Sequence, residues 1–584
     1  MIGRFPILDI APRVEFGGEI VGVKAIAHED IPVSATVIRE GHDPISADVV
    51  LLDPAGKEVS RTSMNEIWPG SARFGATITP TSTGIWTYYI EAHEEQDPAR
   101  NRDAKRISTR SEPIPLNVEC DRALIGAWYE FFPRSEGAIK NADGSITSGT
   151  FTTAIQSLKR VADMGFDVLY LPPIHPIGVA FRKGKNNSLS ALPTDPGVPW
   201  GIGGAAGGHD AVNPELGTLA DFDVFVAAAK KLNIDIALDL ALQTSPDHPW
   251  VKSNPEWFTT RPDGSIAYAE NPPKKYQDIY PINFDNDYNG IRNEVIRILK
   301  FWIARGISIF RVDNPHTKPV HFWQDVIAAI NSEFPNVVFL AEAFTKPAMM
   351  HALGKAGFQQ SYTYFTWRVS KQELIDYGRE VSEGSAALFR PNFWVNTPDI
   401  LPFHLQTGNP AIFALRAALA ATLSPSWGMY AGYELYEHLP FKEGGEEYLD
   451  SEKYEIKVRD WSRADQGERS LAPFIATLNK IRKEHPALAR LRNLRFHQAE
   501  NDQIIAYSKR QGHDLILVVI NLDPIRAQET TVHWNMQELG LIDGEFAVVD
   551  LLDGAKYTWA PETYVRLDPA RPVGRVAHIV HVKI

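Results

Sequence analysis

The sequence predicts an α/β fold: a (β/α)8 TIM barrel with an inserted loop domain, flanked by N-terminal and C-terminal β-sandwich domains. Three observations lead to this prediction. The first part of the chain carries short β-branched segments separated by turn signals, the middle part alternates apolar strands with amphipathic helices, and the last part returns to a β pattern. We therefore expect an N-terminal domain at residues 1–118, the barrel at 119–486 and a C-terminal domain at 487–584.

The N-terminal domain is predicted to be all-β. Turn signals such as Asp53–Gly56 and Pro80–Gly84 separate its β-branched segments, and this spacing is typical of a sandwich. The segments are Glu19–Ala25, Val33–Arg39, Ala47–Leu52, Ala72–Pro80 and Gly84–Ala92. The charged stretch Glu94–Ser111 that follows them is interpreted as an exposed linker or loop.

From Leu124 onward, short apolar runs alternate with segments of helical periodicity, as in a barrel of parallel strands. The candidate barrel strands are Leu124–Phe131, Val168–Leu171, Ile234–Leu240, Ile307–Val312, Val337–Ala341, Tyr362–Phe365, Phe393–Asn396 and Gly428–Tyr430. The candidate helices between them include Thr152–Met164, Leu219–Leu232, Ile291–Arg305 and His321–Glu333.

Two connections in this region are too long for ordinary loops between a strand and a helix. They cover residues 172–219 and 242–290, and both are rich in Pro and Asn. Long loops without elements of their own are usually functional or disordered. Above the rim of a barrel, these two would form the walls of a substrate cleft.

Two more helices and a β pattern complete the chain. Ala411–Leu423, which carries Arg416, is predicted to be an amphipathic helix, and Leu471–His485 is predicted to close the barrel region. The β segments of the C-terminal domain are Ile504–Tyr507, Leu515–Ile520, Ala547–Leu551 and Val576–Val582.

Composition and charge exclude several classes of protein. The formal net charge of −13 argues against nucleic acid or an anionic membrane as the main partner. The single cysteine, Cys120, cannot form an intrachain disulfide, which fits a reducing compartment. The N-terminus has no signal-peptide apolar region, and no apolar run is long enough for a membrane span. We therefore expect a cytoplasmic protein.

Acidic side chains follow three of the apolar runs, at the point where each candidate strand ends. Asp313 and Glu342 directly follow two of these runs, and Asp399 lies just beyond a third. The C-terminal ends of barrel strands meet at the rim where catalytic residues gather. Two carboxylates about 5 Å apart on neighbouring strands suit retaining glycosidic chemistry, with a nucleophile and an acid that later acts as a base. The sequence favours Asp313 as nucleophile, Glu342 as acid and base, and Asp399 as stabiliser of the transition state.

Each of these residues also has a simpler interpretation. A single acid after a strand is most often a helix cap or a solvated loop residue. Arg311 lies two residues before Asp313 on the same strand face, where its charge could keep that carboxylate ionised. The residues alone leave the glycosidic and the structural interpretation open.

The motifs around these acids resemble a known family. The segments 310–313 (FRVD), 341–343 (AEA) and 393–399 (FWVNTPD) look like the three catalytic motifs of the α-amylase superfamily. One branch, the α-1,4-glucan:maltose-1-phosphate maltosyltransferases, resembles the chain more closely. The segments that carry this closer resemblance are 127–135 (AWYEFFPRS), 169–178 (LYLPPIHPIG), 182–184 (RKG), 238–250 (LDLALQTSPDHPW), 311–319 (RVDNPHTKP) and 452–454 (EKY).

The resemblance implies a reaction and a set of site residues. Maltose would pass from α-maltose 1-phosphate to the non-reducing 4-hydroxyl of an α-1,4-glucan, with release of phosphate and retention of configuration. Asp313, Glu342 and Asp399 carry over in the roles given above. The substrate-binding positions that carry over are Lys183, Gln243, Asp278, Asn314, Lys453 and Tyr454, with Asn271 and Tyr276 at the phosphate pocket; Arg311 is grouped with them. No cofactor is implied.

The chain departs from the wider superfamily in ways that bear on metals and assembly. Gln243 and Thr244 occupy the positions where ordinary amylases place an Asn and a His, so we expect neither their calcium site nor that histidine. We expect three histidines to be structural or polar loop residues, because their spacing does not indicate a metal site: His209, His248 and His316. Family members often carry a helical insertion in the N-terminal domain that is associated with dimers. This chain has only a short polar stretch there, and a homodimer is still the expectation.

Two other functions remain open at this stage. One is a plain α-glucan hydrolase, or a transglycosylase that does not use phosphate, on the same barrel. The other is a non-catalytic glucan-binding protein whose sandwich domains supply the affinity. The three acids argue against the second, because a site that had lost catalysis would have no need of all three.

Overall fold

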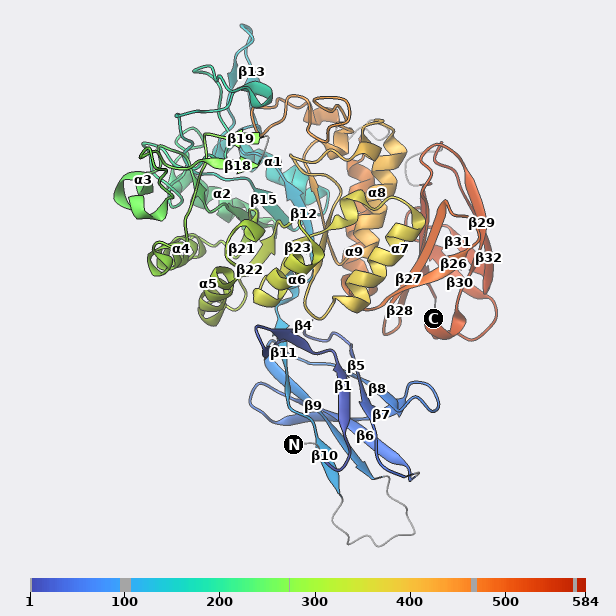
Figure 1. The fold of residues 1–584 in the computed structure, drawn as a ribbon. Helices are drawn as coiled ribbons and strands as arrows, with labels where there is room; N and C mark the ends of the chain where they lie inside the picture. Colours follow the sequence, from blue (N-terminus) through green and yellow to red (C-terminus); the bar gives the residue numbers. More distant parts are fainter. Residues whose placement is uncertain are drawn as a thin grey trace.

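The computed structural model describes residues 3–41, 43–94, 107–271, 274–463, 470–570 and 575–583. It contains a closed barrel of parallel strands in the middle of the chain, with a large and mostly antiparallel sheet on either side in sequence. In Figure 1 the N-terminal sheet lies below the barrel and the C-terminal sheet lies beside helices α8 and α9. The predicted fold class is confirmed.

The strands that close the barrel, as far as the described residues go, are β12 (Gly126–Glu130), β15 (Val168–Leu171), β16 (Asp235–Leu240), β21 (Ile309–Val312), β22 (Val338–Ala341), β23 (Gln360–Tyr362), β24 (Pro391–Trp394) and β25 (Ser426–Tyr430). Each strand pairs in parallel with the next, and β25 closes on β12. All eight overlap the segments that the sequence predicted.

The sixth strand lies earlier than expected. The sequence predicted Tyr362–Phe365, whereas the strand ends at Tyr362 and a 3-10 turn covers Tyr364–Trp367. Thr363 causes this change, because its hydroxyl accepts the Phe365 N–H at 3.3 Å and so begins the turn. A short polar side chain that bonds its neighbouring backbone competes with strand pairing.

Helices with apolar faces cover the outside of the barrel. The helices are α1 (Phe151–Asp163), α2 (Leu219–Lys231), α4 (Tyr288–Ile303), α5 (Val320–Glu333), α6 (Pro347–Ala356), α7 (Lys371–Arg379), α8 (Pro410–Leu423) and α9 (Ala472–Glu484). Hydroxyl caps start several of them; Thr150, for example, accepts the Thr153 N–H at the start of α1. The sequence analysis did not predict α6 and α7.

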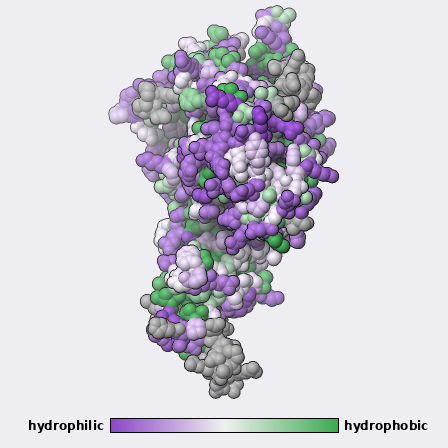
Figure 2. Space-filling view, turned by 90° about the vertical axis from the view of Figure 1, so that its right-hand side faces the viewer, coloured by the Kyte–Doolittle hydropathy of each residue, from purple (hydrophilic) through white to green (hydrophobic). Residues whose placement is uncertain are grey.

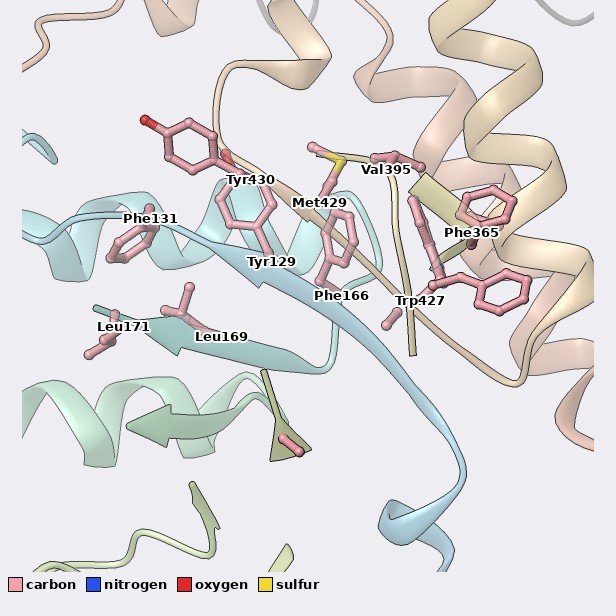
Figure 3. Close-up of a cluster of buried hydrophobic side chains, with 14 of the residues drawn as sticks. Tyr129, Phe131, Phe166, Leu169, Leu171, Phe365, Val395, Trp427, Met429 and Tyr430 are labelled. Atoms are coloured by element: carbon pink, nitrogen blue, oxygen red, sulfur yellow. The ribbon is translucent and has the colours of Figure 1, made fainter. Parts of the chain in front are cut away.

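Side chains alternate between the barrel interior and its helical coat. Trp128 and Tyr170 point into the interior cluster, whereas their neighbours Tyr129 and Leu169 belong to the large core outside the strands. Figure 3 shows part of that outer core, where Tyr129, Leu169 and Trp427 lie together among the strands and helices. The rigid double-sided packing fixes where each strand ends, and therefore where the residues after it lie.

The N-terminal sheet has the strand order β1-β5-β8-β7-β6-β9-β11-β4, with β10 paired to β9. The bounds are β1 (Ile7–Ala11), β4 (Val23–Ile26), β5 (Ile31–Val37), β6 (Ile45–Leu52), β7 (Glu58–Glu66), β8 (Arg73–Ile78), β9 (Gly84–Glu94), β10 (Ser108–Arg110) and β11 (Ile114–Glu119). Within the predicted linker, Ser108–Arg110 is therefore a strand; residues 95–106 lie outside the described part of the chain. Buried Arg390 joins this sheet to the barrel, because it pairs with Glu119 and donates to the Ala25 carbonyl.

The C-terminal sheet has the order β31-β30-β33-β28-β27-β26-β29-β32. The bounds are β26 (Leu494–Ala499), β27 (Ile504–Gln511), β28 (Asp514–Asn521), β29 (Gln528–His533), β30 (Phe546–Asp550), β31 (Lys556–Trp559), β32 (Glu562–Leu567) and β33 (Ala577–Val582). The face of the molecule seen in Figure 2 is mostly hydrophilic over this sheet.

The prediction of an amphipathic helix at Ala411–Leu423 is wrong. Every residue of that range in α8 is buried, including Arg416. The helix packs between barrel strand β25 and sheet strand β28, so both of its faces are covered. Arg416 is accommodated because it donates to the carbonyls of Phe365 and Arg368 at 2.6 Å each. An isolated charge in an apolar run is therefore no reliable sign of an exposed face.

The two long connections contain only short elements. The first connection runs from β15 to α2 and the second from β16 to α4. Among their described residues, the longest helix is α3 (Pro249–Ser253). Short strands are present in the second connection: β17 (Gln243–Thr244), β18 (Ala269–Asn271), β19 (Lys274–Tyr276) and β20 (Tyr280–Pro281). None of the helices in the described residues has the length and apolar character that crossing a membrane requires.

Candidate active site

A cavity of about 780 Å³ opens at the C-terminal ends of the barrel strands. Its lining includes the three predicted acids, Asp313, Glu342 and Asp399, which therefore converge in one hollow. Both long connections contribute to the wall, the first through residues such as Lys183 and the second through residues such as Tyr276. A cavity of this size at this end of a barrel is where a small-molecule substrate would bind.

The fold places two of the acids side by side. Asp313 and Glu342 directly follow β21 and β22, which are neighbours with Val312 opposite Ala341. The Glu342 N–H donates to the Val312 carbonyl at 3.0 Å, so the pairing continues to the acid itself. Adjacent parallel strands lie about 5 Å apart, the separation that retaining glycosidic chemistry needs.

Asp399 reaches the same cavity from a different kind of segment. It lies five residues beyond the end of β24, in a turn in which Thr397 and Ile400 exchange backbone hydrogen bonds at 3.1 Å. The Asp399 N–H donates to the Thr397 hydroxyl at 3.3 Å. The turn therefore holds the third acid above the strand ends.

Arg311 lies beneath these acids and connects them. One of its terminal nitrogens donates to Asp239 at 2.6 Å and to Asp313 at 2.8 Å, and the other pairs with Glu342 at 2.8 Å. Arg311 is 4% exposed and is not among the described residues that line the cavity. It lies below the cavity floor and orients the acids, and its grouping with the substrate contacts stays a prediction.

Burial and the shared cation separate the pKa values of the acids. Burial alone would raise the pKa of Asp313, but the positive charges of Arg311 and Lys318 outweigh it and lower that pKa below its ordinary value. Burial raises the pKa of Glu342 to about 8; Arg311 opposes this rise, and the negative charge of Asp313 adds to it. Asp239 behaves like Glu342, with a pKa of about 7. Near neutral pH the site therefore offers an ionised Asp313 beside a protonated Glu342.

Lys453 holds Asp399. Its ammonium forms a hydrogen-bonded ion pair with the Asp399 carboxylate and lies 5.6 Å from the ring centre of Trp200. Burial disfavours the charge of Lys453, yet the negative charge of Asp399 raises its pKa. Tyr454, the next residue, lines the cavity beside it.

The remaining predicted substrate contacts also line the cavity, with one exception. Lys183 and Asp278 are both buried and lie 3.9 Å apart, although they belong to different connections. Burial raises the pKa of Asp278, and the charge of Lys183 opposes this. Gln243, Tyr276, Asn314 and Tyr454 complete the predicted set. The side chain of Asn271 lies outside the described part of the structure.

The cavity lining also includes residues that the sequence analysis did not assign to the site, among them Trp200, His316 and Lys318. Lys318 donates to the carbonyls of Asp313 and Asn314 at 3.3 and 3.2 Å, which places its charge beside the candidate nucleophile. Its position within the same short motif as Asp313 was the available signal. The Trp200 indole N–H points to buried Asp239 at 3.4 Å, a contact that no sequence pattern reveals.

Two of the histidines expected to be structural form a closed hydrogen-bond network. The Trp250 N–H donates to His248 Nδ1 at 3.0 Å, so His248 carries its proton on Nε2 and donates to His209 Nδ1 at 3.1 Å. The other nitrogen of His209 then donates to the Ala241 carbonyl at 2.8 Å. Burial lowers the pKa of both rings, which is consistent with neutral packing residues.

Comparisons with known proteins agree with this geometry. The model of domain N/S of α-1,4-glucan:maltose-1-phosphate maltosyltransferases matches residues 3–122, and a model described as GLGE, C-terminal, matches residues 496–582. Among solved structures, a cyclomaltodextrinase is 14% identical with a TM-score of 0.62, covering 96% of this chain and 98% of its own. The maltogenic α-amylase AmyB of Thermotoga neapolitana is 19% identical with a TM-score of 0.60, covering 79% of this chain and 99% of its own. These likenesses show the fold.

The curated relatives show more. "Alpha-1,4-glucan:maltose-1-phosphate maltosyltransferase 2" of Streptomyces coelicolor is 51% identical, and the alignment covers all of this chain and 96% of the relative. The alignment runs over 655 positions, more than the 584 residues of this chain, so the relative has segments that the chain lacks. The enzyme of the same name from Mycobacterium tuberculosis H37Rv is 43% identical over 99% of this chain and 96% of its own length. The chain belongs to the α-1,4-glucan:maltose-1-phosphate maltosyltransferase family of glycosyltransferases.

Proposed function

We propose that this enzyme transfers maltosyl units from α-maltose 1-phosphate to the non-reducing 4-hydroxyl of an α-1,4-glucan and releases inorganic phosphate. The reaction would proceed with retention of configuration, through two displacements at the same anomeric carbon. The observation that carries the proposal is the pair of acids at the ends of β21 and β22, with opposite pKa shifts, facing one cavity.

In the first displacement, ionised Asp313 attacks the anomeric carbon of the donor. The bond between this carbon and the phosphate oxygen breaks, its electron pair leaves with the phosphate, and a maltosyl–Asp313 ester forms. Glu342, protonated near neutral pH, can supply a proton to the departing oxygen. Because phosphate is already a good leaving group, this proton matters less here than in hydrolysis of an ordinary glycosidic bond.

In the second displacement, Glu342 acts as a base. It has given up its proton in the first step, so it can accept the proton of the acceptor 4-hydroxyl. The alkoxide oxygen attacks the anomeric carbon, the ester bond breaks, and its electron pair returns to the Asp313 carboxylate. Glu342 is protonated again, and both acids have regained their starting forms.

Asp399 and the surrounding cations would stabilise the charges that develop between the ground state and the transition state. The anomeric carbon becomes positive in the transition state, and a carboxylate fixed by Lys453 can strengthen its hydrogen bonds to the sugar hydroxyls at that moment. We assign Lys183 and Tyr276, at the two walls of the cavity, to the donor and its phosphate, with Asn271 at the phosphate as a further assignment. Phosphate accepts several hydrogen bonds, and these residue types are donors.

The decisive experiment is phosphate release from α-maltose 1-phosphate in the presence of a short maltooligosaccharide. We expect phosphate and an acceptor longer by two glucose units, in equal amounts. In the reverse direction, maltoheptaose with inorganic phosphate should yield maltose 1-phosphate. Hydrolysis of maltoheptaose in both the presence and absence of phosphate, with no maltose 1-phosphate formed, would instead support a plain glucan hydrolase.

The covalent intermediate has its own test. Replacing Glu342 with Ala keeps the nucleophile but removes the base, so we expect a mass increase of one maltosyl group on the intact protein after incubation with donor alone. The adduct should be absent when Asp313 is also replaced with Ala. A Glu342→Ala enzyme that still releases phosphate but never carries an adduct would contradict the double displacement.

We also propose that the enzyme is a homodimer, as the resemblance implies. Light scattering during size-exclusion chromatography should give twice the chain mass of 65.2 kDa. A single-chain mass at micromolar concentration would refute this part of the proposal and leave the chemistry unaffected.

A further inference from the structure

Three potential metal ligands meet outside the cavity, at the junction between helix α9 and the C-terminal sheet. His485 is the C-terminal cap residue of α9, Asp514 is the first residue of β28, and His581 lies in β33. One ligand atom of each lies within 4.8 Å of the other two. The proposed transfer reaction uses none of them. They are far apart in the sequence, so no spacing pattern could have revealed them.

The pairing of the sheet explains why two of them share a face. His581 lies opposite Ile516 in the antiparallel pair of β28 and β33. Asp514 lies two residues before Ile516 and therefore projects from the same face, diagonal to His581. Ile516 belongs to the core that the sheet shares with the barrel, so this face is turned toward the barrel, where α8 contacts β28. The end of α9 then brings His485 to the same point.

The oxygen atoms of Asp514 divide their roles. Oδ2 accepts the Ala487 N–H at 2.8 Å, which fixes the orientation of the carboxylate. Oδ1 lies 2.8 Å from His485 Nδ1 and 3.5 Å from His581 Nε2. Ligands of a tetrahedral zinc ion, with bonds of about 2.0–2.1 Å, are about 3.3 Å apart. These two distances lie on either side of that value, and the two imidazoles have ligand atoms within 4.8 Å of each other, so side-chain movements would place all three ligands around one ion.

We propose that His485, Asp514 and His581 bind a zinc ion, with water as the fourth ligand. Two imidazoles and one carboxylate suit Zn²⁺, whereas Mg²⁺ and Ca²⁺ take six or more oxygen ligands. The three side chains are 13%, 14% and 24% exposed, which leaves an entry path and space for the water. The ion would tie the end of α9 to two strands of the C-terminal sheet, and so would join the barrel to that sheet.

The same sheet offers a matched control. His578 and Asp550 form a pair at 2.7 Å from His578 Nδ1 to the Asp550 oxygen, and they belong to no group of three ligands among the described residues. If His485 and Asp514 were only such a pair, zinc would have no preference for them. A His578→Gln variant removes one imidazole from the same domain without touching the proposed site.

The test measures zinc binding by the full chain, purified without a histidine tag and treated with a chelator. Calorimetry and elemental analysis should give one Zn²⁺ per chain in the unsubstituted protein and in His578→Gln. His581→Gln and Asp514→Asn should each weaken binding by about tenfold or more. Bound Co²⁺ should give the intense visible bands of a four-coordinate ion, and His581→Gln should remove them. Phosphate release should be unchanged in His581→Gln, because the site lies outside the cavity.

Several results would overturn the proposal of a zinc site. Absence of zinc binding would do so, as would binding that survives both His581→Gln and Asp514→Asn, since the ion would then lie elsewhere. An equal loss in His578→Gln would indicate non-specific binding by surface histidines. His581 lies 3.5 Å from Asp514, longer than an ordinary hydrogen bond, so its replacement should leave the fold intact even if Asp514→Asn does not.

Discussion

Burial of the Glu342 carboxyl should lower the free energy of unfolding as the pH rises, and replacing this residue should reveal the effect. In the folded protein, burial raises the pKa of this carboxyl from about 4.5 to about 8. A carboxyl with a raised pKa contributes most to stability below pH 4.5, and this contribution is lost as the pH rises toward 8, because the unfolded chain can ionise and the folded site resists it. Glu342→Gln cannot ionise in either state, so it should escape the loss.

The size of the effect follows from the two pKa values. Each pH unit between them costs about 1.4 kcal/mol, so Glu342→Gln should be more stable than the unsubstituted protein by about 3 kcal/mol at pH 7 and about 5 kcal/mol at pH 8 and above. At pH 5 the difference should be below about 1 kcal/mol. For an unfolding unit of about 300–500 residues, 3 kcal/mol corresponds to a rise of about 3–5 °C in melting temperature.

The assay compares melting temperatures of the two proteins from pH 5 to pH 9. The difference should grow from pH 5 to pH 8 and then remain constant. Glu484→Gln is a suitable control, because this side chain at the end of α9 is 58% exposed and its replacement should follow the unsubstituted protein at every pH. A difference that does not change with pH, or a Glu342→Gln protein that is less stable at pH 8, would refute the assignment of a raised pKa to Glu342.

Three further predictions concern the site and its support. Asp313→Ala should reduce phosphate release by about 10⁴-fold or more, because it removes the nucleophile; initial rates with donor and acceptor test this. Lys453→Met should lower kcat/KM by about 10²-fold, since it frees Asp399 from its fixed position, and the loss should appear mainly in kcat. Arg390→Met should destabilise the protein by about 3–5 kcal/mol, because it removes the guanidinium that pairs with the buried Glu119 carboxylate; denaturant unfolding measures this.

The Lys453→Met and Arg390→Met predictions each have a control or a contrary outcome. Lys442→Met removes a lysine from an exposed position near the same segment as Lys453 and should leave kcat/KM unchanged. A loss with Lys453→Met that is entirely in KM would assign this lysine to ground-state binding instead. Arg390→Met should spare kcat at low temperature, and an immediate loss of turnover would mean that the N-terminal sheet acts on the cavity.

Much of the barrel could be predicted because its strands are apolar on both faces. Val168–Leu171 was placed to the residue, since four buried side chains in a row have no alternative location. Strand β7 of the N-terminal sheet was missed for the opposite reason. Its sequence, residues 58–66, is polar on both faces and mostly exposed, so it carries no alternating pattern. Such a strand is specified by its neighbours β6 and β8 and not by its own side chains.

The residues of the site likewise differ in whether the sequence could predict them. Asp313 and Glu342 could be found because each directly follows a recognisable strand, and the barrel fold fixes where strand ends meet. Trp200 could not be found, because it comes from a long connection whose path depends on tertiary contacts. Strand alternation placed Arg311 on the same face as Asp313, but it could not show that the guanidinium also contacts Asp239 and Glu342.

The sequence suggested an ionised Asp313 beside Arg311, but it could not show how protons are distributed among three buried acids that share this one cation. One guanidinium, Arg311, faces Asp239, Asp313 and Glu342 at 2.6–2.8 Å, and a single positive charge cannot stabilise three buried negative ones. The acid that is ionised is therefore the one that has a second cation beside it. Asp313 has Lys318 beside it, whereas burial leaves Asp239 and Glu342 with raised pKa values. The nucleophile and the acid are thus distinguished by the cations around them and not by residue type. Moving the Lys318 charge should disturb both roles together, because the proton that Asp313 would then accept is the one that Glu342 must keep.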